Sequence, residues 1–187
     1  MIPVEVTKIS FYPPSKGYAV VLQEVGGKKR KLPVIVGSFE AQAIALALEN
    51  VDTPRPMTHD LITTILQEVS VNVKEVVITH LAEGTFYAEI RVESDGMERC
   101  EVDSRPSDAI AIALRLGTPI LVSDSVMTEA GLREESHPDW SGFEELQHGG
   151  ENSRRYLEEQ LQKAIDEEEY EVAAEIRDKI MRLEGKK

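Results

Sequence analysis

The stretch EVDSRPSDAIAIALRLGTPILVSD, residues 101–124, reads as a strand, a helix and a second strand in immediate succession. The first strand ends in the polar segment Asp-Ser-Arg-Pro-Ser-Asp, and the helix after it consists almost entirely of Ala, Ile and Leu. Because proline is favoured in the first turn of a helix, this helix is predicted to begin near Pro106. Alternation of Ala with Ile or Leu is suited to close packing against a sheet. The segment therefore predicts a buried helix with charged groups at its N-terminus.

Other strands and helices are predicted on the N-terminal side of this segment. Alternating and β-branched residues predict strands at 2–11, 18–24, 30–36, 72–81, 85–94 and 97–103. Helices are predicted over 37–50, with Ser38 as its N-cap, and from Thr58, which is expected to cap the second helix. Cys100 is expected to be a small core residue on the apolar face of the sheet. The pattern predicts an α+β fold in which helices pack on a mixed or antiparallel sheet.

The C-terminal third of the chain has a different pattern. Residues 133–153 are rich in Gly, Ser and acidic residues and have little periodicity, so they are predicted to form a linker. Two apolar stripes at helical spacing predict a two-helix hairpin over 154–187. A hairpin of this size is too small to be very stable alone, so it is expected to pack on a partner, a second copy or the main domain. The predicted division is therefore a domain at 1–132, the linker and the hairpin.

Composition limits the functions and compartments that fit the chain. It has 187 residues and a formal net charge of −13, so it does not attract a polyanion at long range. Nucleic-acid binding would need a local basic patch or bridging metal ions, and the basic run is confined to residues 28–31. No signal peptide and no membrane-spanning run is visible, and the single cysteine forbids an internal disulfide. These features predict a cytoplasmic protein with no membrane association.

The polar segment at 103–108 is the first candidate site. The N-terminus of a helix together with Arg105 forms an anion site, to which Ser104 and Ser107 add hydroxyl groups. Asp103 and Asp108 flank the segment and are hard-cation ligands. A bound phosphate and a metal ion together are what phosphodiester hydrolysis needs. The alternative is structural: a serine caps the helix, Asp108 stabilises its first turn, and Arg105 pairs with Asp103.

Two further positions are candidates for the same chemistry. His59 and Asp60 open the second predicted helix and fit either a base with an orienting group or a pair of metal ligands. The alternative for this pair is an ordinary helix start with a favourable acid. Glu40 begins the first Ala-Ile helix, at the place that corresponds to Asp108 in the second, and is a candidate for the same pocket.

Two parts of the sequence resemble known families. The stretches LPVIVGSFEAQAIALAL, THDLITTIL, GTFYAEI and VDSRPSDAIAIALRLGTPILV resemble the bifunctional nuclease (DNase/RNase) domain family over about residues 1–132. The stretch LQKAIDEEEYEVAAEIRDKIMRLE resembles the UVR motif of the UvrB and UvrC excision-repair proteins. This order of domains is similar to a bacterial arrangement. The resemblance implies an α+β fold, nuclease activity on DNA and RNA without strong sequence preference, assembly into a homodimer or larger oligomer, and a UVR hairpin that binds a protein partner.

The residues and the resemblance together give a first hypothesis, a metal-assisted nuclease. Asp103, Asp108 and Glu101 would hold a divalent ion, Mg²⁺ or Mn²⁺. Arg105, with Ser104, Ser107 and the helix N-terminus, would hold the scissile phosphate of DNA or RNA, and His59 or Asp60 would position or activate water. The alternative hypothesis is a non-catalytic stress or repair adaptor, which dimerises and binds a partner through its UVR hairpin.

Overall fold

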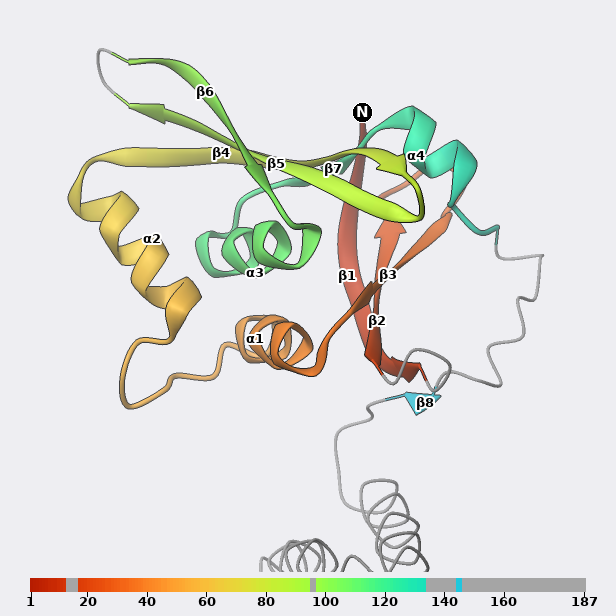
Figure 1. Ribbon diagram of the computed structural model, residues 1–187, viewed down its shortest axis with the longest axis horizontal. Coiled ribbons are helices and arrows are strands. Elements are labelled where there is room, and N and C mark those ends of the chain that lie inside the picture. Colours follow the sequence, from red (N-terminus) through yellow and green to blue (C-terminus); the bar gives the residue numbers. More distant parts are fainter. Residues whose placement is uncertain (13–16, 95–96, 134–143, 146–187) are drawn as a thin grey trace, which may run out of the picture. The chain divides into compact units, whose positions relative to one another are not determined.

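The computed structural model describes residues 1–12, 17–94, 97–133 and 144–145, all within the unit Met1–Glu145 (Figure 1). The predicted hairpin at 154–187 and most of the predicted linker lie outside the described residues. Two residues of that linker, Glu144–Glu145, form strand β8, which pairs with β1 (Ile2–Tyr12).

The described strands form one mixed sheet. Besides β1 and β8, they are β2 (Gly17–Glu24), β3 (Lys31–Val36), β4 (Val71–Ala82), β5 (Thr85–Ser94), β6 (Met97–Ser104) and β7 (Ile120–Val122). Their order is β3-β2-β1-β7-β4-β5-β6, with β8 beside β1 off this path. The β4–β7 pair is parallel, and the other pairs are antiparallel. The short strand β7 therefore joins an N-terminal meander to a second meander, and the predicted α+β class is confirmed.

Helices cover both faces of this sheet. They are α1 (Ser38–Leu48), α2 (Thr58–Glu68), α3 (Pro106–Leu116) and α4 (Asp124–Glu129). Helix α3 packs on β4 and β5, with α1 and α2 beside it, whereas α4 contacts β4 from the other side (Figure 1). None of the helices in the described part of the chain is long and apolar enough to cross a membrane.

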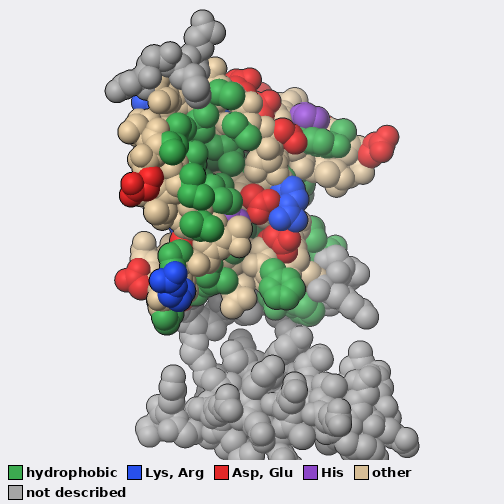
Figure 2. Space-filling view, turned by 60° about the vertical axis from the view of Figure 1, so that its left-hand side comes forward, with side chains coloured by type: hydrophobic (Ala, Val, Ile, Leu, Met, Phe, Trp, Pro, Cys, Tyr) green, Lys and Arg blue, Asp and Glu red, His purple; other side chains and the backbone are tan. Residues whose placement is uncertain are grey.

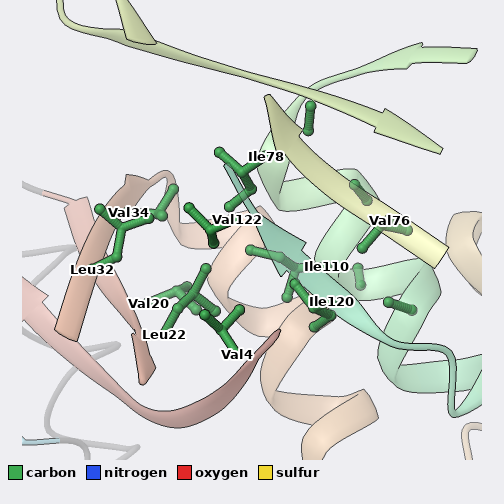
Figure 3. Packing of buried hydrophobic residues seen from close by; sticks show 14 of the residues in the cluster. Val4, Val20, Leu22, Leu32, Val34, Val76, Ile78, Ile110, Ile120 and Val122 are labelled. Atoms are coloured by element: carbon green, nitrogen blue, oxygen red, sulfur yellow. The ribbon is translucent and has the colours of Figure 1, made fainter. Parts of the chain in front are cut away.

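The core lies between the sheet and helix α3. Figure 3 shows Ile110 of α3 among Val76, Ile120 and Val122 from β4 and β7. Five consecutive α3 residues, 109–113, are buried, because the helix is enclosed by the sheet, α1 and α2. The Ala residues among them allow this close approach, as the alternating pattern predicts. Helix α3 is thereby a rigid mount for the polar groups at its N-terminus.

The two predicted N-caps are each displaced by one residue. Ser38 and Thr58 are the first helical residues, and the extended cap conformation belongs to Gly37 (φ −74, ψ 172) and Met57 (φ −82, ψ 177). In α2 the carboxylate of Asp60 accepts a hydrogen bond from the Met57 backbone N–H at 2.8 Å. Asp60 thus accepts from the N–H of the cap residue, whereas the Thr58 hydroxyl was expected to accept from an N–H group within the first turn.

The expectation for Cys100 is wrong, because this residue is exposed. Cys100 is paired with Val92, and Val102 is paired with Ile90, so both lie on the face of the sheet that packs against the helices. However, β6 is the outermost strand, and α3 packs on β4 and β5 instead. Val102 is accordingly 45% exposed. Burial on an edge strand depends on which helices reach it, and the strand's own sequence does not reveal this.

Candidate functional site

The site is built around the turn from β6 into α3. Arg105 is the N-cap of α3, and its carbonyl oxygen accepts hydrogen bonds from the backbone N–H groups of Asp108 and Ala109, each at 3.1 Å. This first turn brings the two charged side chains together. Arg105 Nε donates to Asp108 Oδ2 at 2.8 Å, and Arg105 Nη2 is 3.3 Å from Asp108 Oδ1. The pair is therefore bidentate, and it fixes the plane of both groups.

Helix α1 adds a second carboxylate to the turn. Arg105 Nη1 donates to Glu40 Oε1 at 3.0 Å. Because α1 and α3 pack against each other, the first turns of these two similar segments meet, as the correspondence between Glu40 and Asp108 suggests. The Arg105 side chain nevertheless remains 67% exposed. An incoming anion can therefore reach the guanidinium group from solvent.

Helix α2 supplies an imidazole to the same carboxylate. His59 Nε2 lies 3.0 Å from Asp108 Oδ1, and the His59 side chain is only 13% exposed. Burial raises the pKa of Asp108, but the hydrogen bonds from Arg105 and His59 outweigh it and lower that pKa overall. Asp108 is thus ionised at neutral pH, and it orients His59 by accepting a hydrogen bond from Nε2–H.

Asp60, although adjacent to His59, belongs to a different contact. Arg115 Nε donates to Asp60 Oδ1 at 2.5 Å, while Arg115 Nη1 donates to the carbonyl oxygens of Ala43 (3.1 Å) and Ala111 (2.9 Å). The Arg115 side chain is only 10% exposed. Arg115 therefore ties α1, α2 and α3 together, and we refer to Arg115 and Asp60 as the clamp. Sequence reasoning missed Arg115, although a charged residue within the apolar stretch AIAIALRL was a usable signal.

The clamp also borders a small polar cavity. Its volume is about 170 Å³. Besides Arg115 and Asp60, the lining residues are Leu46, Ala47, Asn50, Val51, Asp52 and Thr53. All of these lie in α1 or in the connection between α1 and α2. The cavity therefore lies beside the clamp, and its lining does not include Asp108, Arg105 or His59.

The remaining predicted residues are dispersed around the turn. Glu101 pairs with Arg91, with 3.1 Å between Oε1 and Nε, and Asp103 is an exposed residue opposite Glu89 in the sheet. Ser104 donates its hydroxyl to the Arg105 carbonyl oxygen at 3.1 Å, and Ser107 is buried. In the described part of the chain, no three His, Cys, Asp or Glu side chains are grouped so that they could hold a metal ion. Of the candidate residues, the structure brings His59, Arg105 and Asp108 together, and Glu40 contacts the same Arg105.

Acid should destabilise the protein partly through the clamp. The hydrogen bonds from Arg115 and from the Met57 N–H hold the pKa of Asp60 below its ordinary value of 3.8. A lowered carboxyl pKa gives stability that is fully present above the ordinary pKa and is lost as pH falls through the folded-state value. We expect the unfolding midpoint of Asp60→Asn to fall less steeply than that of the wild type below about pH 4. Thermal denaturation from pH 7 to pH 2 tests this, and parallel curves would contradict it.

The fold and the site define an α+β protein with an exposed arginine and an oriented histidine at a helix N-terminus. The sequence matches the bifunctional nuclease domain over residues 20–135 and the UvrB/uvrC motif over residues 151–186. The first match covers more than half of the chain. The chain therefore belongs to the bifunctional nuclease domain family, and the UVR motif lies outside the described residues.

Individual relatives agree with this assignment. An uncharacterized protein of Mycobacterium tuberculosis is 43% identical over 129 residues, which cover 69% of this chain and 76% of the relative. Bifunctional nuclease 2 of Arabidopsis thaliana is 28% identical over 185 residues, covering 90% of this chain and 56% of the plant protein. Bifunctional nuclease 1 of Oryza sativa subsp. japonica is 27% identical over 185 residues, which cover 91% of this chain and 56% of the rice protein.

Proposed function

We propose that this chain hydrolyses phosphodiester bonds of DNA or RNA with little sequence preference. The observation that carries the proposal is the cluster at the start of α3, where the ionised carboxylate of Asp108 contacts both the exposed guanidinium of Arg105 and the imidazole of His59. Membership of the bifunctional nuclease domain family and the names of the plant relatives support the same chemistry.

Each member of the cluster has a role in this proposal. Arg105 binds the phosphate and stabilises the charge that develops on it during attack. With Nε2–H donated to Asp108, a neutral His59 keeps Nδ1 as a proton acceptor, so it can take a proton from water or from a ribose hydroxyl. Asp108 acts as the orienting group. Asp60 holds the helix that carries His59, and it does so through Arg115.

The metal-assisted form of this reaction stays a prediction. In the described arrangement, the Arg105 guanidinium lies between the carboxylates of Glu40 and Asp108. Both carboxylates are thus already paired with a cation. The residues present therefore do not fit a Mg²⁺ or Mn²⁺ ion at this cluster, and Glu101 and Asp103 stand apart from Asp108.

The test is hydrolysis of end-labelled single-stranded DNA and RNA by the purified chain, in Mg²⁺, in Mn²⁺ and in EDTA. Activity should be present in the wild type and in the control Glu5→Gln, which changes an exposed carboxylate on β1. It should be lost in the double variant His59→Gln, Asp108→Asn. Activity that is equal in all three proteins would contradict the proposed roles of His59 and Asp108. Full activity in EDTA would exclude the need for a divalent ion.

We also propose that the protein forms a homodimer through α2 and β6. Several large apolar side chains of α2 face solvent, and Figure 2 shows a column of hydrophobic side chains on this face of the molecule. Leu61 is 52% exposed and Ile65 51%, and Val69, the C-cap residue after α2, is 59% exposed. Contiguous exposed apolar surface of this kind marks an interaction site. The apolar residues of β6, Cys100 and Val102, are exposed as well.

The charged residues of β6 favour a second copy of this chain as the partner that covers this surface. Arg99, which already pairs with Glu75 of β4, and Asp103 lie two residues before and after Glu101 on this edge strand, whose register with β5 shifts between Val92 and Ser94. If two copies of β6 pair antiparallel about Glu101, Arg99 of one copy faces Asp103 of the other. Cys100 then faces Val102. Glu101 meets its own counterpart at the centre, but each Glu101 is bound to Arg91 of its own subunit. Opposite charges across an antiparallel pair are stabilising.

Light scattering should therefore give twice the monomer mass for the wild type. The Ile65→Glu variant should give a monomer, because it places a charge on the apolar surface. Thr64→Glu, at an exposed polar position of the same helix, is the matched control and should remain a dimer. A wild-type protein that is monomeric from micromolar to hundreds of micromolar concentration would refute the proposed dimer.

A non-catalytic adaptor is the alternative function, and the UvrB/uvrC motif over 151–186 is the observation that favours it. In that role the motif would bind a protein partner. Partner capture that is unchanged in the double variant His59→Gln, Asp108→Asn, together with a wild type that hydrolyses neither DNA nor RNA, would support the adaptor. Loss of hydrolysis in the same variant supports the nuclease.

A further inference from the structure

Two aromatic rings are stacked on the exposed surface of the second meander. The ring centroids of His80, on β4, and Tyr87, on β5, are 4.3 Å apart, and the angle between their planes is 9°. Thr79 Oγ1 lies 2.9 Å from His80 Nδ1 and so helps to fix the orientation of the imidazole. His80 is exposed, and the Tyr87 residue is 39% exposed. The two stacked rings thus leave part of their aromatic surface exposed to solvent.

The register of the sheet places Tyr87 next to the end of β6. Ala88 of β5 is opposite Ser104, the last residue of β6. Tyr87 precedes Ala88 and Arg105 follows Ser104. In an antiparallel pair these two residues are the next neighbours, so their backbones lie about one strand spacing, ~5 Å, apart. Ala88 points into the core, and Tyr87 therefore projects from the other face of the sheet. The Arg105 guanidinium contacts Glu40 of α1 and Asp108 of α3, which cover the core face, so the aromatic pair and the guanidinium lie on either side of the end of β6.

The negative net charge of the chain makes uncharged contacts, such as those of the aromatic pair, important for binding nucleic acid. With a net charge of −13, the protein gains little from long-range attraction of a polyanion. Acidic residues also lie near the aromatic pair, because Glu89 follows Tyr87 by two residues and Asp103 lies opposite Glu89. Affinity for nucleic acid must then come from contacts that need no positive field. Stacking of bases on aromatic side chains is such a contact, and it is tolerant of base sequence.

We propose that His80 and Tyr87 form a stacking platform for a nucleobase of single-stranded DNA or RNA whose neighbouring phosphate is bound at Arg105. This inference rests on the proposed nuclease function and deepens it by assigning the groups that hold the substrate. A base can lie flat on the platform only when it is unpaired, so the platform favours single-stranded over double-stranded substrate. It also accounts for low sequence preference, because every base offers a flat aromatic face.

The test measures binding after two separate changes, one that removes the aromatic ring of Tyr87 from the protein and one that removes the bases from the oligonucleotide. The host is the double variant His59→Gln, Asp108→Asn, which prevents cleavage during the measurement. Fluorescence anisotropy compares a labelled single-stranded oligonucleotide with an abasic oligonucleotide of the same length. Tyr87→Leu removes the aromatic face, and Tyr87→Phe is the matched control that keeps it. Thermal denaturation of both variants checks that the β4–β5 hairpin is intact.

Tyr87→Leu should bind the normal oligonucleotide about tenfold more weakly than Tyr87→Phe, and the two should bind the abasic probe equally. Equal binding of the normal oligonucleotide, or an equal loss on both probes, would overturn the platform. These results are distinguishable from failure of the proposed function. If the wild type hydrolyses nucleic acid and the leucine and phenylalanine variants bind alike, only the platform fails. If the wild type neither hydrolyses nor binds nucleic acid, both proposals fail.

Discussion

The Asp108→Asn variant is expected to hydrolyse nucleic acid at least about a hundredfold more slowly than the wild type while remaining folded. Asparagine has nearly the same shape as aspartate but carries no charge. It cannot stabilise a protonated His59, and its NH₂ group can compete to donate to the imidazole and so favour the wrong tautomer. It also weakens the bidentate contact that holds the plane of Arg105. Initial rates on single-stranded DNA and RNA at saturating substrate measure the effect.

Arg105→Ala should lower the rate by a similar factor, because it removes the phosphate contact that is most accessible from solvent. The structural alternative makes a different prediction for the same two variants. If the turn is only a cap with an ion pair, each change should cost roughly 1 kcal/mol of stability and leave any activity intact. Rate and unfolding free energy should therefore be measured on the same protein samples. A destabilised but fully active Asp108→Asn protein would end the catalytic interpretation.

Local sequence pattern predicted strands β1 to β7 and helices α1 to α3, because each depends on residues close together in the chain, whereas α4 was not predicted and β8 lies within the predicted linker. The β4–β5 turn is an example, since Glu83 (φ 50) and Gly84 (φ 75) both adopt the left-handed conformation that a two-residue hairpin needs. The order of the strands was not predictable in this way. Strand β7 has three residues and lies between β1 and β4, and nothing in its sequence specifies either neighbour.

The candidate site shows the same division between local and long-range information. Arg105 and Asp108 are three residues apart on one helix turn, so their proximity followed from the sequence. Glu40 contacts Arg105, and His59 contacts Asp108, only because α1 and α2 pack beside α3. Asp60 follows His59 in the chain but points to Arg115 and away from the cluster, which no spacing argument could reveal. Arg115 itself resembled an ordinary charged residue near the end of a helix.

The Arg115→Met variant is expected to lose about 3 kcal/mol of unfolding free energy, because a buried charge partner is removed. Methionine fills part of the volume of the arginine stem but donates no hydrogen bond. The carboxylate of Asp60 and the carbonyl oxygens of Ala43 and Ala111 then lose their donor together. Asp60 is 33% exposed, so water compensates in part for that carboxylate, whereas the Arg115 side chain is only 10% exposed. Urea denaturation followed by circular dichroism measures the change.

The clamp also makes a prediction about activity, which separates it from a general packing defect. Because Arg115 fixes α2 against α3, its loss should let His59 move relative to Asp108, and the hydrolysis rate should fall even under conditions where the variant is fully folded. Arg55→Met makes the same chemical change at an exposed position of the α1–α2 connection and should alter neither stability nor rate. A double-mutant cycle with Asp60→Asn isolates the pairwise energy. If Arg115→Met unfolds like the wild type, or if its cycle with Asp60→Asn is additive, the clamp does not hold the site together.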